Sequence, residues 1–224
     1  MFRYGGAFYL RTDQYLINIP SSFFRKNAKT MYMSLLLVVV SYFVGTFPSA
    51  HLVAGRVGLD PTKRGSGNPG AANVYRIVGQ WSGIAVFFAD FLKGVLAASI
   101  GYAAGGKYLG VICWGAATLG HVAPLTRRLR GGKGVATAGG GAIVLFPIAA
   151  AICFGIFFVI AKTTRKASLG SITIASLLPL LIFAFGASTR EILFTVGLSV
   201  LIILRHYQNI QRLLSGTESS FKSE

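Results

Sequence analysis

Residues 126–137 read T-R-R-L-R-G-G-K-G-V-A-T and separate two long apolar runs, residues 108–124 and 138–161. Several apolar runs in the chain approach or exceed the roughly 20 residues that a membrane-spanning helix needs. The chain has 224 residues, of which only 12% are charged, whereas a soluble domain carries about 25% charged residues. We therefore predict an all-α, multi-pass transmembrane protein in which this basic stretch is a loop.

The composition of this loop also indicates a ligand. Its glycines let the backbone turn sharply and bring N–H groups against a bound molecule. The neighbouring arginines and Lys133 supply the positive charge that a phosphate prefers. A simpler interpretation remains open, because a basic loop can serve only to orient the protein in the membrane.

The formal net charge of the chain is +16, from 22 basic and 6 acidic residues. The basic residues gather at the ends of apolar runs, which favours membrane orientation or an anionic substrate over nucleic-acid binding. The cysteines Cys113 and Cys153 lie inside apolar runs and form no metal-binding pattern with the three histidines. We therefore expect no metal and no cofactor.

The distribution of charge along the chain predicts its topology. Short basic loops stay on the cytoplasmic side, and the basic stretches are 60–76, 126–133, 162–166 and the tail from Arg205. The turns at 105–107 and 187–191 carry little charge. All four basic stretches share one side if residues 135–161 either cross twice as short or half-depth helices or dip into the membrane and return, with break points at Pro147 and the glycine run 139–141. This count predicts seven helices, with the N-terminus outside and the C-terminus inside.

Three regions follow from this layout. Residues 1–30 form a basic extension that we expect to be poorly ordered, with Met31 or Met33 as the natural start. Residues 31–218 form the membrane domain, and residues 219–224 form a tail.

Asp90 and Lys93 lie three residues apart near the middle of an apolar run, so they share a helix face. A structural ion pair between them is favoured over a catalytic role.

Each predicted cytoplasmic stretch carries groups suited to a phosphorylated ligand that bears hydroxyls. The candidates are Ser66, Asn68, Asn73 and Arg76 in the first stretch, Lys133 in the second, Ser168 and Ser171 in the third, whose polar residues continue to position 171, and His206 and Asn209 in the tail. No histidine is followed five positions later by aspartate, which excludes the His-x4-Asp acyltransferase signature. Six acidic residues also leave no carboxylate cluster for a metal-dependent transferase.

Three segments of the chain resemble the motifs of a known family. They are G-S-G-N-P-G-A-A-N-V-Y-R at 65–76, G-H-V-A-P at 120–124 with G-G-K-G-V-A-T at 131–137, and H-Y-Q-N-I-Q-R-L-L-S-G-T-E at 206–218. Together they are similar to the bacterial acyl-phosphate:glycerol-3-phosphate acyltransferase family, over about residues 33–218. Asp90, Lys93 and Gly94 also look like a family feature.

The resemblance implies an enzyme of the cell inner membrane with seven helices and a cytoplasmic active site. Such an enzyme transfers a fatty acyl group from acyl phosphate to the 1-hydroxyl of glycerol 3-phosphate, giving lysophosphatidic acid and phosphate. It needs no cofactor and no metal, and its partners are these two substrates, membrane lipids and the enzyme that makes acyl phosphate. By resemblance the catalytic residues are Ser66, Lys133 and His206, and the substrate-binding residues are Asn68, Asn73, Arg76, Gly131, Gly132, Gly134, Ser171 and Asn209.

Two positions depart from the family pattern, and two other functions stay open. Ala72 stands where the family often has Thr, and Tyr207 stands where it often has Arg, so Arg205 is a candidate replacement for that cation. A membrane transporter for phosphorylated solutes would also use polar, glycine-rich breaks. A purely structural membrane scaffold would fit the composition as well.

Overall fold

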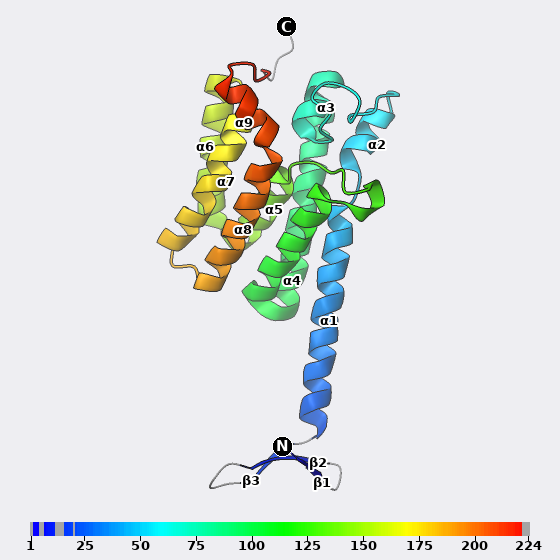
Figure 1. Ribbon diagram of the computed structural model, residues 1–224, viewed down its shortest axis with the longest axis vertical. Helices are drawn as coiled ribbons and strands as arrows, with labels where there is room; N and C mark the ends of the chain where they lie inside the picture. The colour runs from blue at the N-terminus through cyan, green and yellow to red at the C-terminus, as the bar shows by residue number, and fades with distance from the viewer. Residues whose placement is uncertain (1, 5–6, 12–15, 20, 221–224) are drawn as a thin grey trace.

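A computed structural model describes residues 2–4, 7–11, 16–19 and 21–220 of the chain. Three short antiparallel strands come first, in the order β1-β2-β3. They are β1 (Phe2–Tyr4), β2 (Ala7–Arg11) and β3 (Leu16–Ile19). The helices that follow are α1 (Ser21–Gly45), α2 (Ser49–Gly55), α3 (Ala71–Ile77), α4 (Gln80–Val122), the 3₁₀ turn η1 (Leu125–Arg127), α5 (Val135–Leu145), α6 (Pro147–Thr164), α7 (Ala167–Ala184), α8 (Thr189–Arg205) and α9 (Tyr207–Leu214). They form one bundle (Figure 1), which confirms the predicted all-α membrane fold.

The N-terminal sheet was not predicted from the sequence. It lies within the predicted extension 1–30, at the far end of α1 from the bundle (Figure 1). Helix α1 begins at Ser21 and passes residue 30 without a break. The domain boundaries at residues 30 and 218 therefore stay predictions.

Helix α4 is a hairpin of two antiparallel arms rather than one straight helix. The backbone leaves helical geometry at Gly105 (φ −152°, ψ 23°) and Gly106 (φ 71°, ψ −171°). The positive φ of Gly106 is one that residues with a side chain rarely adopt. The arms pack closely, since a Cβ atom on Gly101 would lie 2.7 Å from the carbonyl oxygen of Leu109. The predicted turn at 105–107 is thus confirmed.

The predicted break within residues 135–161 is also confirmed. Helix α5 ends at Leu145, Phe146 is non-helical (φ −141°, ψ 61°), and Pro147 begins α6. Proline suits the first position of a helix, where no backbone N–H is needed. Helix α7 begins at Ala167, inside the polar stretch 162–171, so Ser168 and Ser171 lie on its first turns.

Small residues let α4 and α5 cross at backbone contact. A Cβ atom on Gly140 would lie 1.9 Å from the carbonyl oxygen of Phe91, and one on Gly94 would lie 1.9 Å from that of Thr137. Beside this crossing the fully buried Trp114 donates its indole N–H to the carbonyl of Ala138 at 2.9 Å. This crossing sets the position of α5 and hence of the basic loop that precedes it.

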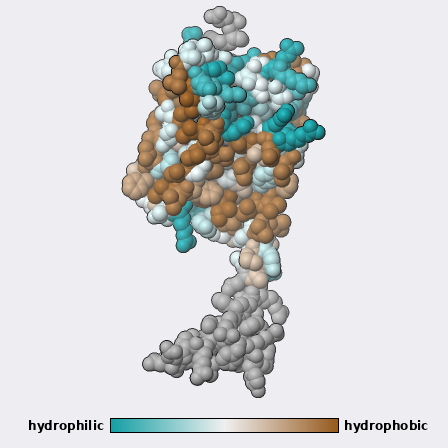
Figure 2. Space-filling model, in the orientation of Figure 1, coloured by the Kyte–Doolittle hydropathy of each residue, from teal (hydrophilic) through white to brown (hydrophobic). Residues whose placement is uncertain are grey.

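The outer surface of the bundle suits a lipid environment. Large apolar side chains such as Phe158, Phe183 and Leu193 are about two-thirds exposed, and apolar residues cover much of the bundle in Figure 2 while polar ones gather near its upper end. Among the described residues, four helices are long and apolar enough to span a membrane, or five if the α8–α9 pair, bent by 59°, is one span. One of these segments contains both arms of α4, so the number of segments is not the number of crossings. The number of crossings and their orientation stay predictions.

Candidate active site

A cavity of about 480 Å³ lies where the predicted polar stretches meet. Segments from six parts of the chain line it: residues 66–76, both arms of α4, residues 133–136, Phe157 of α6, the start of α7, and the C-terminal segment from His206 to Ser219. Most of the predicted site residues are in this lining, namely Ser66, Asn68, Asn73, Arg76, Lys133, Gly134, Ser171, His206 and Asn209. The structure therefore brings together residues that are up to 143 positions apart in the sequence.

The first polar stretch is folded around the side chain of Asn73. Its amide oxygen accepts the backbone N–H of Ser66 at 2.9 Å, and its amide nitrogen donates to the carbonyls of Pro61 and Arg64 at 2.9 and 3.0 Å. Both amide hydrogens are thus used within the loop. Asn73 is 1% exposed, so it holds Ser66 at the cavity wall and has no free donor for a substrate.

Lys133 reaches the cavity from the glycine-rich loop before α5. Its ammonium group donates to the amide oxygen of Asn209 on α9. The pKa of Lys133 is lowered to about 8, chiefly by burial and also by the cations Arg212, Arg76 and Arg205, while Glu218 opposes the shift. The site therefore holds a cation with few compensating charges, which suits an anionic ligand.

Gly131 and Gly132 do not line the cavity, and they shape the loop instead. Their carbonyl oxygens accept the guanidinium of Arg205 at 3.0 and 3.4 Å. Arg205 is bound to the loop and lies outside the cavity lining, so it does not supply a phosphate-binding cation there; a role toward a lipid headgroup stays a prediction. Tyr207 points elsewhere, since it is 62% exposed and its hydroxyl accepts from the amide of Gln211.

His206 lies at the junction of α8 and α9 and is 2% exposed. Its Nδ1 is 2.8 Å from the carbonyl oxygen of Ile202. A carbonyl oxygen only accepts, so Nδ1 carries the hydrogen and the neutral ring leaves Nε2 as an acceptor. This tautomer is the one that a proton-accepting histidine needs.

The C-terminal segment closes one side of the cavity through Glu218. This buried carboxylate accepts from Ser168 at 2.5 Å, from Asn209 at 2.7 Å and from Arg212 at 2.8 Å. Burial raises its pKa, but these hydrogen bonds outweigh that effect and the net pKa of Glu218 is lowered. The carboxylate thus stays ionised and fixes α7 against α9.

The segment after Glu218 also contacts Arg76. The guanidinium of Arg76 donates to the carbonyl oxygens of Ser220 and Ser219 at 3.0 and 3.3 Å. These are neutral acceptors, so a phosphate that enters the cavity would be a stronger partner for the same donors.

Several lining residues were not identified as site residues from the sequence. They are Asp90, His121, Arg212 and Glu218, with Ser168 noted only as a hydroxyl. One signal was available for Glu218, which is the acid inside the third motif, in a tail that is otherwise mostly basic and polar. Within the part of the chain that the structure describes, no group of three or more His, Cys, Asp or Glu side chains is placed to hold a metal ion.

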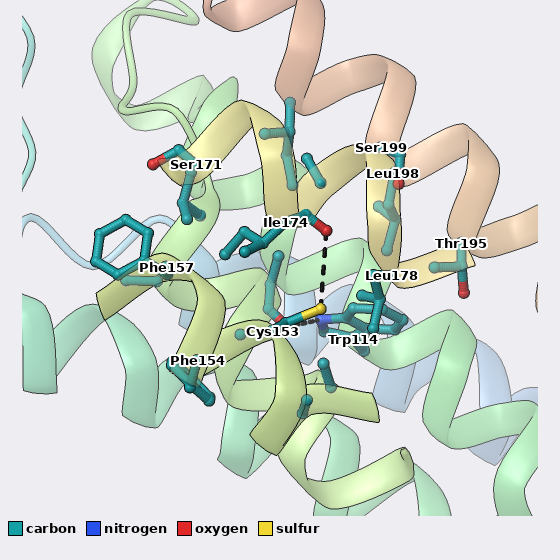
Figure 3. A pocket seen from close by; sticks show the side chains of 18 of the residues that line it. Trp114, Cys153, Phe154, Phe157, Ser171, Ile174, Leu178, Thr195, Leu198 and Ser199 are labelled. Carbon is teal, nitrogen blue, oxygen red and sulfur yellow. Dashed lines mark hydrogen bonds between the residues drawn. The ribbon is translucent and has the colours of Figure 1, made fainter. Parts of the chain in front are cut away.

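A second, smaller cavity of about 90 Å³ adjoins the first between the helices. Its lining is mostly apolar and includes Trp114, Cys153, Phe154, Leu178 and Leu198. Trp114, Cys153 and Leu178 lie close together in Figure 3. The thiol of Cys153 lies 3.9 Å from the carbonyl of Ile174. The two cavities share the following lining residues: Phe87, Val135, Ala136, Phe157 and Ser171.

Known proteins are similar to this chain in sequence and in fold. The family model for glycerol-3-phosphate acyltransferase matches residues 35–216. A glycerol-3-phosphate acyltransferase of Syntrophomonas wolfei is 40% identical over 184 residues, covering 82% of this chain and 94% of that protein. One of Geobacter sulfurreducens is 39% identical over 194 residues, covering 86% of this chain and all of that protein.

A solved structure agrees with these relatives. The crystal structure of PlsY (YgiH), an integral membrane glycerol 3-phosphate acyltransferase, in its glycerol 3-phosphate form has a TM-score of 0.82 and 36% sequence identity to this chain. The match covers 85% of this chain and 96% of that one. The resemblance seen in the three motifs is confirmed, and the chain belongs to the glycerol-3-phosphate acyltransferase family.

Proposed function

We propose that this chain transfers a fatty acyl group from acyl phosphate to the 1-hydroxyl of glycerol 3-phosphate, releasing lysophosphatidic acid and inorganic phosphate. The observation that carries the proposal is the polar cavity, which holds Arg76 and Lys133 beside His206 and Asn209 and adjoins an apolar cavity. Two phosphate-bearing substrates need cations, and a fatty acyl chain needs an apolar space. Membership of the family supports this assignment.

The residues of the cavity have different roles in the proposed reaction. Arg76 and Lys133 bind the phosphates, and Asn68, Asn209 and Ser171 orient the glycerol hydroxyls. Ser66 donates a hydrogen bond to the acyl phosphate. Acyl phosphate is an activated anhydride, so direct transfer needs no covalent acyl-enzyme, and alignment of the two substrates can supply several kcal/mol of the barrier reduction.

His206 acts as the general base in this scheme. Its Nε2 accepts the proton of the 1-hydroxyl while the hydroxyl oxygen bonds to the acyl carbon. The bond between that carbon and the phosphate oxygen then breaks, and phosphate leaves with the proton returned from His206. Backbone N–H groups at Gly134 and Val135, where the loop lines the cavity, stabilise the negative charge that develops on the acyl oxygen.

The cytoplasmic side of the inner membrane is the proposed location of this site. The basic stretches 60–76, 126–133 and 162–166 and the tail gather toward one end of the bundle, away from the α4 turn and the α7–α8 connection (Figure 1). Short basic loops stay cytoplasmic. Acyl phosphate made by a separate enzyme would reach this face. The alternative function, a transporter, needs a polar path to both ends of the bundle.

The donor assignment is tested with purified protein in detergent. Palmitoyl phosphate and glycerol 3-phosphate are supplied together, and lysophosphatidic acid and phosphate are measured in parallel. We expect the two products in equal amounts. Palmitoyl coenzyme A and palmitoyl acyl carrier protein serve as comparison donors, and an equal or faster rate with either of them would overturn the acyl phosphate assignment.

Replacing His206 with Gln tests the general base. We expect kcat to fall by at least roughly 100-fold, since a positioned base contributes about 10²- to 10⁴-fold. The amide of Gln keeps a polar side chain of similar size, so substrate binding should change little. A loss of less than about threefold would instead assign proton removal to a substrate phosphate.

Lys133 should give the reaction an alkaline limit. Because its pKa is lowered to about 8, the ammonium cation is present below that pH and is lost above it. We expect kcat/KM for glycerol 3-phosphate to fall by about tenfold per pH unit above pH 8, since this ratio reports the free enzyme. The Lys133→Arg variant keeps its charge and should lack this limit; the same fall in that variant would assign it to another group.

A further inference from the structure

A buried polar cluster lies behind the glycine-rich loop, and the reaction scheme above does not use it. It consists of Ser49, Asp90, Lys93 and His121, and we call it the Asp90 cluster. All four are 7% exposed or less. They come from α2 and from both arms of α4, so the cluster joins three helical segments at one point.

Lys93 is fully occupied inside this cluster. Its ammonium group donates to the carboxylate of Asp90 at 2.6 Å, to the hydroxyl of Ser49 at 3.0 Å and to the carbonyl of Phe47 at 2.6 Å. These contacts use all three of its hydrogens. Lys93 therefore fixes Asp90 in place and has no donor left for a ligand.

Asp90 in turn holds His121. The carboxylate oxygen that Lys93 contacts also lies 3.5 Å from Nδ1 of His121. The backbone carbonyl of Asp90 accepts the hydroxyl of Thr137 at 3.0 Å, which ties the same residue to α5. The ring of His121 is thus restrained on its Nδ1 side by a group that cannot easily move.

Gly131 and Gly132 pack against the backbone carbonyl of His121 and against the Nε2 side of its ring. The N–H of Gly132 donates to the carbonyl of His121 at 3.1 Å. A Cβ atom on Gly132 would lie 2.2 Å from Nε2 of His121, and one on Gly131 would lie 2.1 Å from its carbonyl oxygen. The two glycines directly before Lys133 are therefore in contact with both the backbone and the ring of His121.

We propose that Asp90 and His121 are positioning residues, which hold the Gly131–Gly132 turn and through it the ammonium group of Lys133. This inference rests on the proposed function, in which Lys133 binds a substrate phosphate. A buried ion pair is weak evidence for stability, since apolar replacements are often as stable. The cluster instead sets the distance between α4 and the loop that carries the cation.

A double-mutant cycle between His121 and Lys133 tests the proposal. Binding of glycerol 3-phosphate is measured by calorimetry on the wild type, His121→Ala, Lys133→Met and the double variant. We expect each single variant to raise Kd by at least tenfold. If His121 acts through Lys133, adding His121→Ala to Lys133→Met should change Kd by less than threefold. Independent, multiplicative effects would overturn the proposal, as would a His121→Ala variant with wild-type Kd.

Thr118→Val is the matched control for this cycle. Thr118 is buried one turn before His121 on the same arm of α4, and its hydroxyl donates to the carbonyl of Trp114 in its own helix. Its replacement keeps the shape of the side chain. We expect Kd within twofold of the wild type, which separates a general loosening of the arm from the loss of the His121 contact.

If His121→Ala does not fold, a steric test probes the same contact between Gly132 and the ring of His121. Gly132→Ala forces a methyl group against the His121 ring, so Kd should rise by at least 30-fold. In Gly132→Ala with His121→Ser the methyl group occupies the space that the ring leaves, and Kd should recover by at least fivefold relative to Gly132→Ala alone. A double variant that binds no better than Gly132→Ala would contradict the proposal.

Failure of this inference can be told apart from failure of the proposed function. Calorimetry needs no acyl donor, and inorganic phosphate can replace glycerol 3-phosphate as the probe of Lys133. If the cycle shows coupling between His121 and Lys133 but the wild type transfers no acyl group, only the proposed function is overturned. If the wild type transfers the acyl group but the cycle shows no coupling, only the positioning role is overturned.

Discussion

Replacing Lys133 with Met is expected to lower kcat/KM for glycerol 3-phosphate by at least roughly 100-fold, about 2.7 kcal/mol of transition-state stabilisation. Met keeps the length and apolar stem of Lys, so the change removes mainly the charge and its hydrogen-bond donors. In the proposed function Arg76 already binds a phosphate, and Arg212 is held by Glu218. Neither cation can therefore fully replace Lys133.

The effect of this substitution is measured as initial rates of phosphate release at several glycerol 3-phosphate concentrations. Lys162→Met is the matched control, because Lys162 is an exposed cation in the last turn of α6 and lies outside the cavity lining. The control should keep near-normal turnover. Activity of the Lys133 variant within threefold of the wild type would refute the role assigned to this cation.

Gly140→Val is expected to prevent the bundle from assembling correctly. A Cβ atom there would lie 1.9 Å from the backbone carbonyl of Phe91, and a backbone group cannot rotate away as a flexible side chain can. Overpacking typically costs about 1–3 kcal/mol when side chains can adjust; here α4 and α5 must separate, which should cost more. We expect loss of monodisperse protein in detergent, or a Tm lower by more than about 10 °C.

The control for this packing prediction is Gly155→Val on α6. Apart from its chain neighbours and the backbone of its own helix, a Cβ atom at Gly155 would have no atom within 4 Å among the described residues. Valine at this position should therefore leave the Tm within a few degrees of the wild type. Equal thermal unfolding of the two variants would show that the α4–α5 crossing is not as close as described.

The breaks between helices could be predicted from the sequence because they depend on local chemistry. Gly106 adopts a positive φ at the α4 turn, and Pro147 starts α6, as glycine and proline at these places indicate. The start of α7 inside a polar stretch was less evident, because the partner of Ser168 is Glu218, 50 positions later in the chain. The N-terminal strands carried no clear pattern at all.

The members of the site were easier to predict than their roles. Arg76, Lys133 and His206 stand out as polar residues at the ends of apolar runs, and all three line the cavity. The role of Asn73 in building its loop depends on three contacts that only the folded chain makes. His121 lies 31 positions after Asp90, and no helical periodicity relates two arms of a hairpin.

The most direct test of the central claim is a structure of the protein with glycerol 3-phosphate bound. We predict phosphate density between Arg76 and Lys133, with the glycerol hydroxyls toward His206 and Asn209. Glycerol 3-phosphate bound outside this cavity, or within it but away from both Arg76 and Lys133, would contradict the account.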